Sequence, residues 1–217
     1  MKKVTAIVPV RKGSQRVKNK NIKPFGDSSL LQIKLNKLLK IRSRLEDIIV
    51  TSDCPEMLEM ANSMGAKTHE REPYFAGSQA TNSEFFDNLS MITDCDNVLY
   101  SPVTCPFISL ETYEECLKDF ENSESVVTVK PVKHHLWLDG KPLNYSLNNS
   151  PNSQDLPNIY QITYGVCLLS RKLMKTYRNV VTPKPTFKVL NEIESMDIDT
   201  EFDFMMAEIL YNKMRES

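Results

Sequence analysis

The sequence predicts an α/β fold with a mainly parallel β-sheet, and three observations support this prediction. The segment Val4–Val10 is rich in β-branched and apolar residues, which suits a central strand covered on both faces. From there to Val129, strand-like and helix-like segments alternate, as they do when helices connect parallel strands. The long polar loop Arg11–Asn21 follows the first strand, and folds of this class bind ligands beyond the carboxyl ends of their strands.

The elements are predicted in order along the chain. Val4–Val10 is the first strand, with Pro9 near its end, where a strand tolerates proline. Leucines at helical spacing predict a helix over Ser28–Ile41, and Gly65 suits the end of the next helix. The remaining predicted strands are Asp47–Ser52, Ala66–Glu70, Asn97–Ser101, Val126–Val129 and Thr163–Leu169. The remaining predicted helices are Cys54–Met64, Ser83–Thr93, Leu110–Glu121 and Thr200–Met214.

The alternation of strands and helices stops at His134. Asp139-Gly140 is typical of a hairpin turn, and the stretch Asn148–Asn158 is rich in Asn, Ser and Pro. We predict one domain over residues 1–217, in which His134–Ile162 is an inserted arm used for dimerisation. The expected assembly is a homodimer.

The composition narrows the classes of function. The 217 residues suffice for one large domain, and 41% hydrophobic with 25% charged residues is an ordinary globular balance. A formal net charge of -1 argues against a nucleic-acid-binding protein. The five cysteines form no C-x-x-C pair and are interpreted as reduced thiols. The first apolar run is too short to span a membrane and lacks a signal-peptide cleavage pattern, so we expect a cytoplasmic protein without a membrane partner.

The loop Arg11–Asn21 is a candidate phosphate site. Gly13 lets a ligand approach the backbone closely, and Ser14 adds a hydroxyl. A polyphosphate needs several cations together, and this loop carries Arg11, Lys12, Arg16, Lys18 and Lys20. The loop matches neither G-x-x-x-x-G-K-[ST] nor G-x-G-x-x-G, which disfavours a kinase-type P-loop and a dinucleotide-binding turn. A solvated basic loop without a ligand is the alternative interpretation.

A second candidate site is the acidic pair in Met196-Asp-Ile-Asp199. Asp197 and Asp199 are two residues apart, so in an extended segment they face the same side. Two carboxylates on one side suit Mg²⁺, which prefers oxygen ligands and keeps waters and substrate phosphates as further ligands. From spacing alone, capping of the following helix is an equally good explanation, and Asp203 in its first turn favours the helix N-terminus.

The segment Ile7-Val-Pro-Val-Arg-Lys-Gly-Ser-Gln-Arg16, with Lys20-Asn21 and Pro24-Phe-Gly26, resembles the signature of the acylneuraminate cytidylyltransferase family. These enzymes are the CMP-sialic acid synthetases and relatives that act on other 2-keto sugar acids. The resemblance implies a three-layer, Rossmann-like nucleotide-diphosphosugar-transferase fold, CTP and Mg²⁺ as ligands, and release of pyrophosphate. It also favours Asp197 and Asp199 as the metal ligands.

The resemblance extends to the walls of the expected site. Arg71 would lie at the nucleotide base, and Pro102-Val-Thr-Cys-Pro-Phe107 is similar to the family's Gln-Pro-Thr-Ser-Pro segment, with Pro102 in place of Gln. The implied nucleotide-binding residues are Arg11, Lys12, Gly13, Ser14, Arg16, Lys20, Asn21, Arg71, Asn82 and Thr104.

The sugar side departs from the family pattern. Ser153-Gln-Asp-Leu-Pro157 resembles Arg-Gln-x-Leu-Pro with Ser153 in place of Arg, and Thr163-Tyr-Gly165 resembles Pro-Asn-Gly with Tyr164 in place of Asn. The implied substrate-binding residues are Gln154, Tyr164 and Gly165. These changes indicate a substrate other than plain N-acetylneuraminate, or a carboxylate contact supplied from elsewhere.

The expected reaction is attack by the anomeric hydroxyl of a 2-keto sugar acid on the α-phosphorus of CTP. Because such transfer depends on positioning and charge neutralisation, we expect Arg11, Lys20 and Asp199 to be catalytic. One alternative is a glycosyltransferase that uses a nucleotide-sugar donor. Another is a non-catalytic relative acting as a binding or assembly subunit, which the changes at Pro102, Ser153 and Tyr164 keep open.

Overall fold

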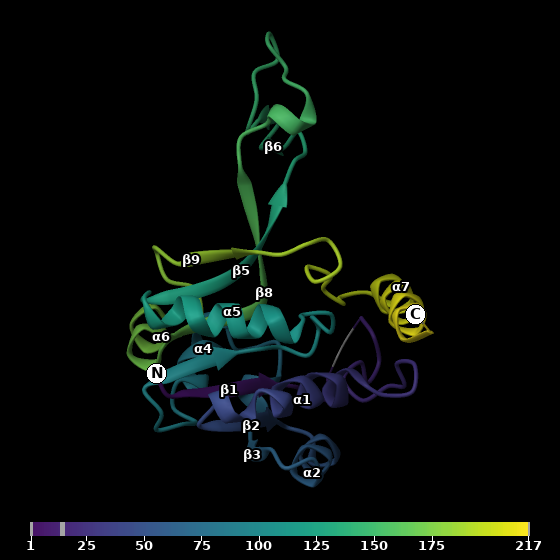
Figure 1. The fold of residues 1–217 in the computed structure, drawn as a ribbon, viewed down its shortest axis with the longest axis vertical. Helices are drawn as coiled ribbons and strands as arrows, with labels where there is room; N and C mark the ends of the chain where they lie inside the picture. Colours follow the sequence, from purple (N-terminus) through teal and green to yellow (C-terminus); the bar gives the residue numbers. More distant parts are fainter. Residues whose placement is uncertain (1, 14–15, 217) are drawn as a thin grey trace.

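The computed structural model describes residues 2–13 and 16–216, and its centre is a twisted sheet flanked by helices (Figure 1). In the described residues the main sheet has seven strands in the order β3-β2-β1-β4-β8-β5-β9. Its strands are β1 (Val4–Pro9), β2 (Asp47–Ser52), β3 (Lys67–Glu70), β4 (Asn97–Tyr100), β5 (Ser125–Val132), β8 (Ile159–Ser170) and β9 (Thr186–Val189). Within that sheet β8 pairs antiparallel with both neighbours, and the other pairings are parallel. The predicted mainly parallel α/β fold is therefore confirmed.

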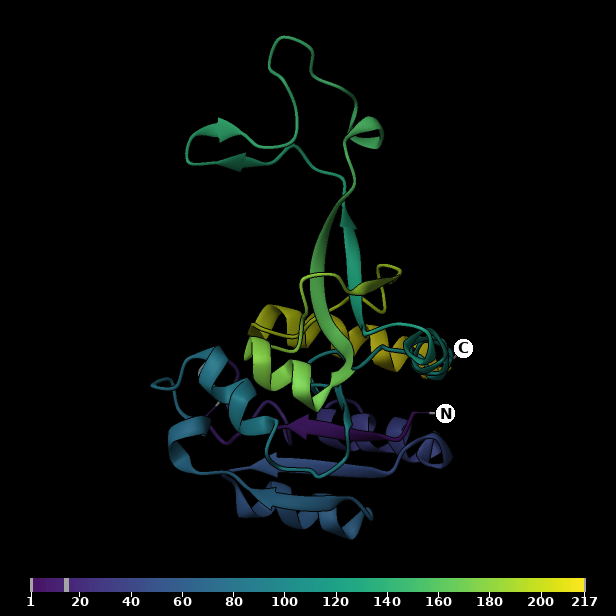
Figure 2. The same cartoon turned by 90° about the vertical axis from the view of Figure 1, so that its left-hand side faces the viewer.

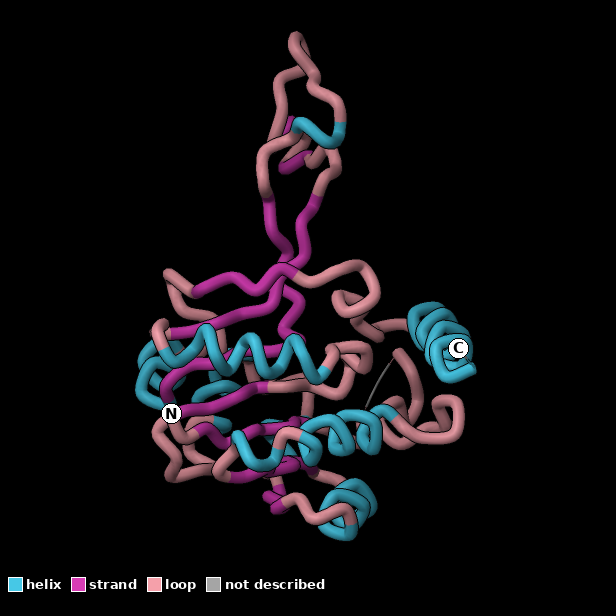
Figure 3. Tube along the Cα trace, viewed as in Figure 1, coloured by secondary structure: helices cyan, strands magenta, loops and turns pink. Residues whose placement is uncertain are grey.

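Helices cover both faces of this sheet, as Figure 3 shows in cyan. They are α1 (Leu30–Lys40), α2 (Pro55–Ser63), α3 (Pro73–Ala76), α4 (Asn82–Leu89), α5 (Leu110–Glu121), α6 (Arg171–Tyr177) and α7 (Glu201–Glu216), with 3₁₀ turns η1 (Arg42–Arg44) and η2 (Ser153–Asp155). Because side chains alternate along a strand, Ala6 and Val8 pack with α1, α2 and α5, while Ile7 packs with α4 and α6. Two hydrophobic clusters thus separate three layers, as predicted.

Local signals explain where the longer helices begin. The Ser29 side chain accepts a hydrogen bond from the Gln32 backbone at the start of α1, and Ser109 does the same for α5. Helix α4 begins with a reciprocal capping box between Thr81 and Glu84. This helix ends at Leu89, which corrects the predicted end at Thr93. Residues after Leu89 turn instead, and Ser90 donates its hydroxyl to the Asp87 carbonyl.

The predicted insertion forms an arm that projects from the body in both Figure 1 and Figure 2. Its base is a two-stranded ribbon in which Val132 of β5 pairs with Ile159 of β8, so residues 159–162 belong to the main sheet rather than to the insertion. The hairpin of β6 (Trp137–Leu138) and β7 (Lys141–Pro142) turns at Asp139 and Gly140, which both have positive φ. Within the described residues, no helix is long and apolar enough to cross a membrane.

Candidate active site

A cleft of about 470 Å³ opens where β1 and β4 end, at the carboxyl edge of the sheet. Ten of the residues predicted from the sequence line this cleft: Arg11, Arg16, Lys20, Asn21, Arg71, Asn82, Thr104, Tyr164, Asp197 and Asp199. The basic loop and the acidic pair, far apart in the sequence, therefore face one space.

Four predicted residues do not belong to this lining, and one lies outside the described residues. Lys12 and Gly13 are exposed at the start of the loop, where the Lys12 backbone donates to Asp53 Oδ1 at 3.0 Å. Gln154 lies in η2 of the arm and does not line the cleft. Gly165 is buried, and an added Cβ there would lie 2.8 Å from Ile108 Cδ1. Ser14 falls outside the described residues.

The loop from Arg11 to Asn21 is closed by its last residue. The Asn21 amide, which is buried, donates to the Arg11 carbonyl at 3.0 Å. The Arg11 guanidinium in turn donates to the Ala76 carbonyl at 3.0 Å, which joins the loop to the end of α3. Asn21 thus shapes the loop, and Arg11 ties it to the end of α3.

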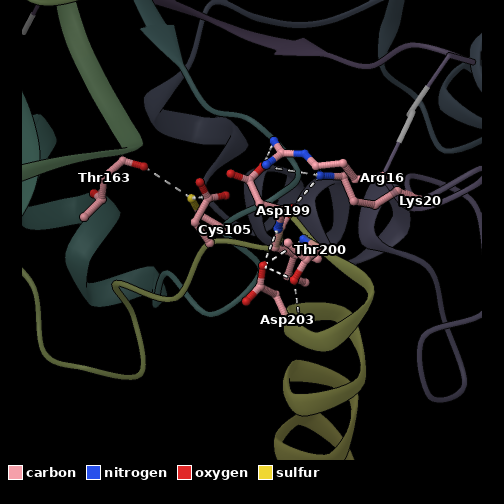
Figure 4. Close-up of polar contacts among 9 residues, drawn as sticks. Arg16, Lys20, Cys105, Thr163, Asp199, Thr200 and Asp203 are labelled. Carbon is pink, nitrogen blue, oxygen red and sulfur yellow. Dashed lines mark hydrogen bonds and ion pairs between the residues drawn. The ribbon is translucent and has the colours of Figure 1, made fainter.

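Cations of the loop reach the acidic pair directly (Figure 4). Arg16 donates to Asp199 Oδ1 at 2.9 Å, and Lys20 Nζ lies 4.0 Å from the same oxygen. The Lys20 ammonium also donates to the Ile198 carbonyl. Burial lowers the pKa of Lys20, and the Asp199 carboxylate opposes that shift. The two sequence motifs therefore form one charged site.

The start of α7 shows why the two aspartates are available. The Thr200 hydroxyl accepts from the Asp203 backbone at 3.2 Å, and Asp203 Oδ2 accepts from the Thr200 backbone at 2.7 Å. Asp203 also accepts from the Asp199 backbone at 3.1 Å. The helix is therefore capped by Thr200 and Asp203, and helix capping is not the role of Asp197 or Asp199.

Asp197 is the carboxylate of the pair whose charged form is disfavoured by its surroundings. Desolvation by the nearby protein raises its pKa, and the neighbouring Asp199 carboxylate acts in the same direction. Cys105 Sγ lies 3.9 Å from Asp197 Oδ1. The described residues contain no group of three or more His, Cys, Asp or Glu side chains suited to a metal. Two carboxylates beside an open cleft nevertheless fit Mg²⁺, which commonly takes one or two protein carboxylates together with waters and phosphates.

Arg71 forms the far wall of the cleft. Its side chain is only 3% exposed, and it donates to the carbonyls of Val10 and Thr51. Its Nε is buried without a hydrogen-bond partner among the described residues, and its guanidinium lies 5.3 Å from the Phe85 ring centre. Burial lowers its pKa to about 10. An unpartnered donor beside an aromatic ring suits a planar polar ligand group.

The cleft also contains residues that the sequence reading missed. Phe85, Tyr100 and Thr163 are examples, and they make the wall between Arg71 and the acidic pair partly apolar. The Phe85-Phe86 pair within α4 was an available signal, because both rings line the cleft. Phe86 also packs edge-to-face on Tyr100, with ring centres 5.6 Å apart.

Comparison with known proteins agrees with this geometry. The sequence profile of the cytidylyltransferase family matches residues 5–180. This chain belongs to the cytidylyltransferase family. It is thus a nucleotidyltransferase, and the glycosyltransferase alternative loses its support.

Two relatives match almost end to end. Pseudaminic acid cytidylyltransferase of Campylobacter jejuni is 24% identical, covering 97% of each chain. CMP-N,N'-diacetyllegionaminic acid synthase of Legionella pneumophila is 24% identical, covering 99% of each chain. Among solved structures, a CMP:2-keto-3-deoxy-manno-octonic acid synthetase complexed with CTP superposes with a TM-score of 0.74 at 11% identity, covering 98% of this chain and 99% of that one. This last likeness confirms the predicted fold.

Proposed function

We propose that this cytidylyltransferase transfers CMP from CTP to the anomeric hydroxyl of a 2-keto sugar acid, either N-acylneuraminate or a related nonulosonate or octulosonate. The observation that carries the proposal is the contact of Arg16 and Lys20 with Asp199 in one cleft. This contact unites a cationic triphosphate site with a carboxylate pair suited to a metal. The printed names of the two relatives, which refer to pseudaminic and legionaminic acids, support a sugar-acid acceptor.

In this proposal the nucleotide spans the cleft from Arg71 to the basic loop. The base lies at Arg71, which lines the cleft beside the Phe85 ring and presents a planar guanidinium to a planar ligand group. Asn82 and Thr104 line the same cleft and contact the nucleoside. The triphosphate lies against Arg11, Arg16 and Lys20. Contacts from Lys12 and Gly13, which do not line this cleft, and from Ser14, which lies outside the described residues, stay predictions.

The acidic pair completes the phosphate end. We propose that Asp197 and Asp199 hold Mg²⁺, which when bound supplies positive charge to the phosphate oxygens. Arg11 and Lys20 neutralise the charge that develops on the leaving pyrophosphate. The anomeric oxygen forms its bond to the α-phosphorus and releases its proton to water, as the bond from that phosphorus to the pyrophosphate oxygen breaks. The chain contributes mainly alignment and charge neutralisation.

The sugar acid would enter beside Tyr164, which is half-exposed at the edge of the cleft. Gln154 lies in the arm, so we propose that it contacts sugar acid bound in the cleft of a partner protomer. This places the arm in a homodimer, as its exposed Trp137 and Leu138 support. Gly165 lies against Ile108 within the sheet, and its predicted contact with substrate stays a prediction.

A pyrophosphate-release assay tests the proposed function. Purified protein with Mg²⁺ is given each of the four ribonucleoside triphosphates and a panel of 2-keto sugar acids, including pseudaminic, legionaminic and neuraminic acids. We expect release with CTP and at least one acid. No release with any combination, while CTP still binds by calorimetry, would identify a non-catalytic binding subunit instead.

Asp199→Ala is the variant that tests the proposed metal site in this assay. We expect turnover to fall by about a hundredfold or more, because the variant removes one carboxylate of the proposed metal pair and the partner of Arg16. The fold should persist, since the Arg16–Asp199 pair is largely exposed and such pairs contribute little stability. Unchanged turnover in Asp199→Ala with an intact far-UV circular dichroism spectrum would refute the role of Asp199.

A further inference from the structure

The most unusual group outside the cleft lining is the ammonium of Lys34. Lys34 lies on α1 and its side chain is completely buried. It donates to three acceptors: Ser101 Oγ at 3.1 Å, the Cys105 carbonyl at 3.2 Å and Tyr113 Oη at 2.7 Å. Its hydrogen bonds among the described residues include no carboxylate. Burying a charge without a counter-ion is costly, so its retention calls for an explanation.

Two of the three acceptors of Lys34, Ser101 and Cys105, belong to the segment that forms the cleft beside the acidic pair, and the third, Tyr113, lies on α5. Ser101–Cys105 follows β4, and its residues Pro102, Val103 and Thr104 line the cleft. The Ser101 hydroxyl also lies 3.3 Å from the Gly165 carbonyl, next to Tyr164. Lys34 is thus fixed to the back of a wall whose front faces the ligand.

The same segment holds the acidic pair in place. The Thr104 carbonyl accepts from the Ile198 backbone at 2.9 Å, between the two aspartates. Cys105, whose carbonyl accepts from Lys34, also has its sulfur 3.9 Å from Asp197 Oδ1. The Lys34 ammonium is therefore linked to the Asp197–Asp199 segment in two steps. Lys34 donates to the Cys105 carbonyl, and the carbonyl of the preceding residue, Thr104, accepts from the Ile198 backbone.

We propose that Lys34 is a positioning residue for nucleotidyl transfer, which fixes the Ser101–Cys105 segment and thereby the Asp197–Asp199 carboxylates. The proposal rests on the proposed function, because those carboxylates are assigned there to Mg²⁺. Lys34 itself touches neither nucleotide nor metal. Without the two hydrogen bonds from Lys34 to Ser101 and Cys105 the segment is held less firmly. Small displacements of aligned groups have large effects on transfer rates.

Lys37 supplies a matched control on the same helix. It lies one turn beyond Lys34 and also extends a mostly buried ammonium to backbone carbonyls, those of Pro106 and Ile108 at 2.6 and 2.7 Å. Neither Pro106 nor Ile108 lines the cleft. Lys37→Met thus removes the same chemistry from the same helix but leaves the cleft segment attached.

The test compares wild type with Lys34→Met and Lys37→Met. For Lys34→Met we expect kcat to fall about tenfold or more and the Mg²⁺ concentration for half-maximal rate to rise about fivefold, with little change in KM for CTP. Calorimetry gives a readout without turnover: CTP affinity in EDTA should match wild type within about twofold, whereas its enhancement by Mg²⁺ should be reduced. Lys37→Met should resemble wild type in every measurement.

The outcomes distinguish a failure of the positioning role of Lys34 from a failure of the proposed cytidylyltransferase reaction. Equal effects in Lys34→Met and Lys37→Met, or no effect in either, would overturn the positioning role even while wild type transfers CMP. A wild type that releases no pyrophosphate would refute the proposed function, and the Mg²⁺-dependence of CTP binding would still test Lys34. If Lys34→Met does not fold, Lys34→Gln and Lys37→Gln are compared instead, because the glutamine amide keeps hydrogen-bond donors without charge.

Discussion

The buried ammonium of Lys34 should make the stability of this protein depend on pH in a way that one substitution isolates. Burial lowers the pKa of Lys34 from 10.5 to about 8. Between these values the unfolded chain binds a proton at Lys34 that the folded protein does not, so the free energy of unfolding rises with pH. Below pH 8 both states are protonated, and the buried charge carries its full cost.

The magnitude follows from the size of the shift. At about 1.4 kcal/mol per pKa unit, the buried charge costs the folded state about 3 kcal/mol at pH 7. By pH 9.5 the folded protein has released most of this proton, and the remaining cost is about 1 kcal/mol. Lys34 should therefore add about 2 kcal/mol of stability between these two pH values.

Other groups titrate in the same range, so a difference measurement is needed. Burial lowers the pKa of Lys37 to about 8 as well, which adds a rise of the same sign. Burial raises the pKa values of the Cys105 and Cys116 thiols to about 12, and stability from these groups falls with pH above their ordinary value. Subtracting Lys34→Met from wild type leaves the contribution of Lys34 together with the smaller effect of its charge on the pKa values of Lys37 and Cys105.

The assay is urea unfolding followed by far-UV circular dichroism at pH 7 and about pH 9.5. Fluorescence is unsuitable, because the single tryptophan, Trp137, is exposed in the arm. The stability of wild type relative to Lys34→Met should rise by about 2 kcal/mol between the two pH values, while hydrogen bonds lost in the variant add a constant offset. Lys40→Met, an exposed position on α1, should parallel wild type. A wild-type advantage that does not change with pH would refute the reasoning.

Two further predictions concern the sheet and the arm. Gly165→Ala should lower the free energy of unfolding by about 1–3 kcal/mol, because the new Cβ would crowd Ile108, and an unchanged urea midpoint would contradict this packing. Replacing the exposed Trp137 and Leu138 by serine should convert a dimer to a monomer in sedimentation equilibrium with the body still folded. A dimer that survives both substitutions would mean that the arm tip is not the interface.

Much of the fold followed from local pattern. Helix α5 was predicted with its observed bounds, because Ser109 caps its start and apolar residues recur at helical spacing. Strand β9 was missed because Thr186–Val189 is short and mostly exposed, and it is defined by parallel pairing with β5, far away in the sequence. The short helix α6 was missed for a related reason: its one buried residue, Met174, gives no periodic pattern.

The candidate site was likewise predictable where its signal lies within a few neighbouring residues, and not where it depends on the fold. The basic loop and Asp197–Asp199 were each recognisable, because their charges cluster within a few residues. Their contact across the cleft, through Arg16 and Lys20, depends on the fold. Lys34 was overlooked although a signal existed: it lies four residues from both Leu30 and Leu38, on the buried face of α1. A lysine among apolar positions of a helix predicts a buried ammonium only when its acceptors are known.

The sugar end of the cleft is shaped by the backbone as much as by side chains. Between the pairs Val127–Cys167 and Val129–Ile162, four residues of β8 lie opposite the single residue Thr128, so β8 bulges at Tyr164. Tyr164 has a φ of 57°, a left-handed conformation that is uncommon for a bulky residue and easier for the asparagine of the family pattern.

This strained turn is held by the residues around it. The Thr163 hydroxyl donates to the Thr128 carbonyl at 3.0 Å, and the Val166 backbone donates to Thr128 Oγ1 at 3.0 Å. Strain of this kind persists only where surrounding contacts enforce it, and it is common at ligand sites. Tyrosine at position 164 is therefore built into the bulge that borders the proposed sugar-acid side of the cleft. If Tyr164 contacts the sugar acid as proposed, a change of acceptor specificity requires re-forming that bulge as well as exchanging a side chain.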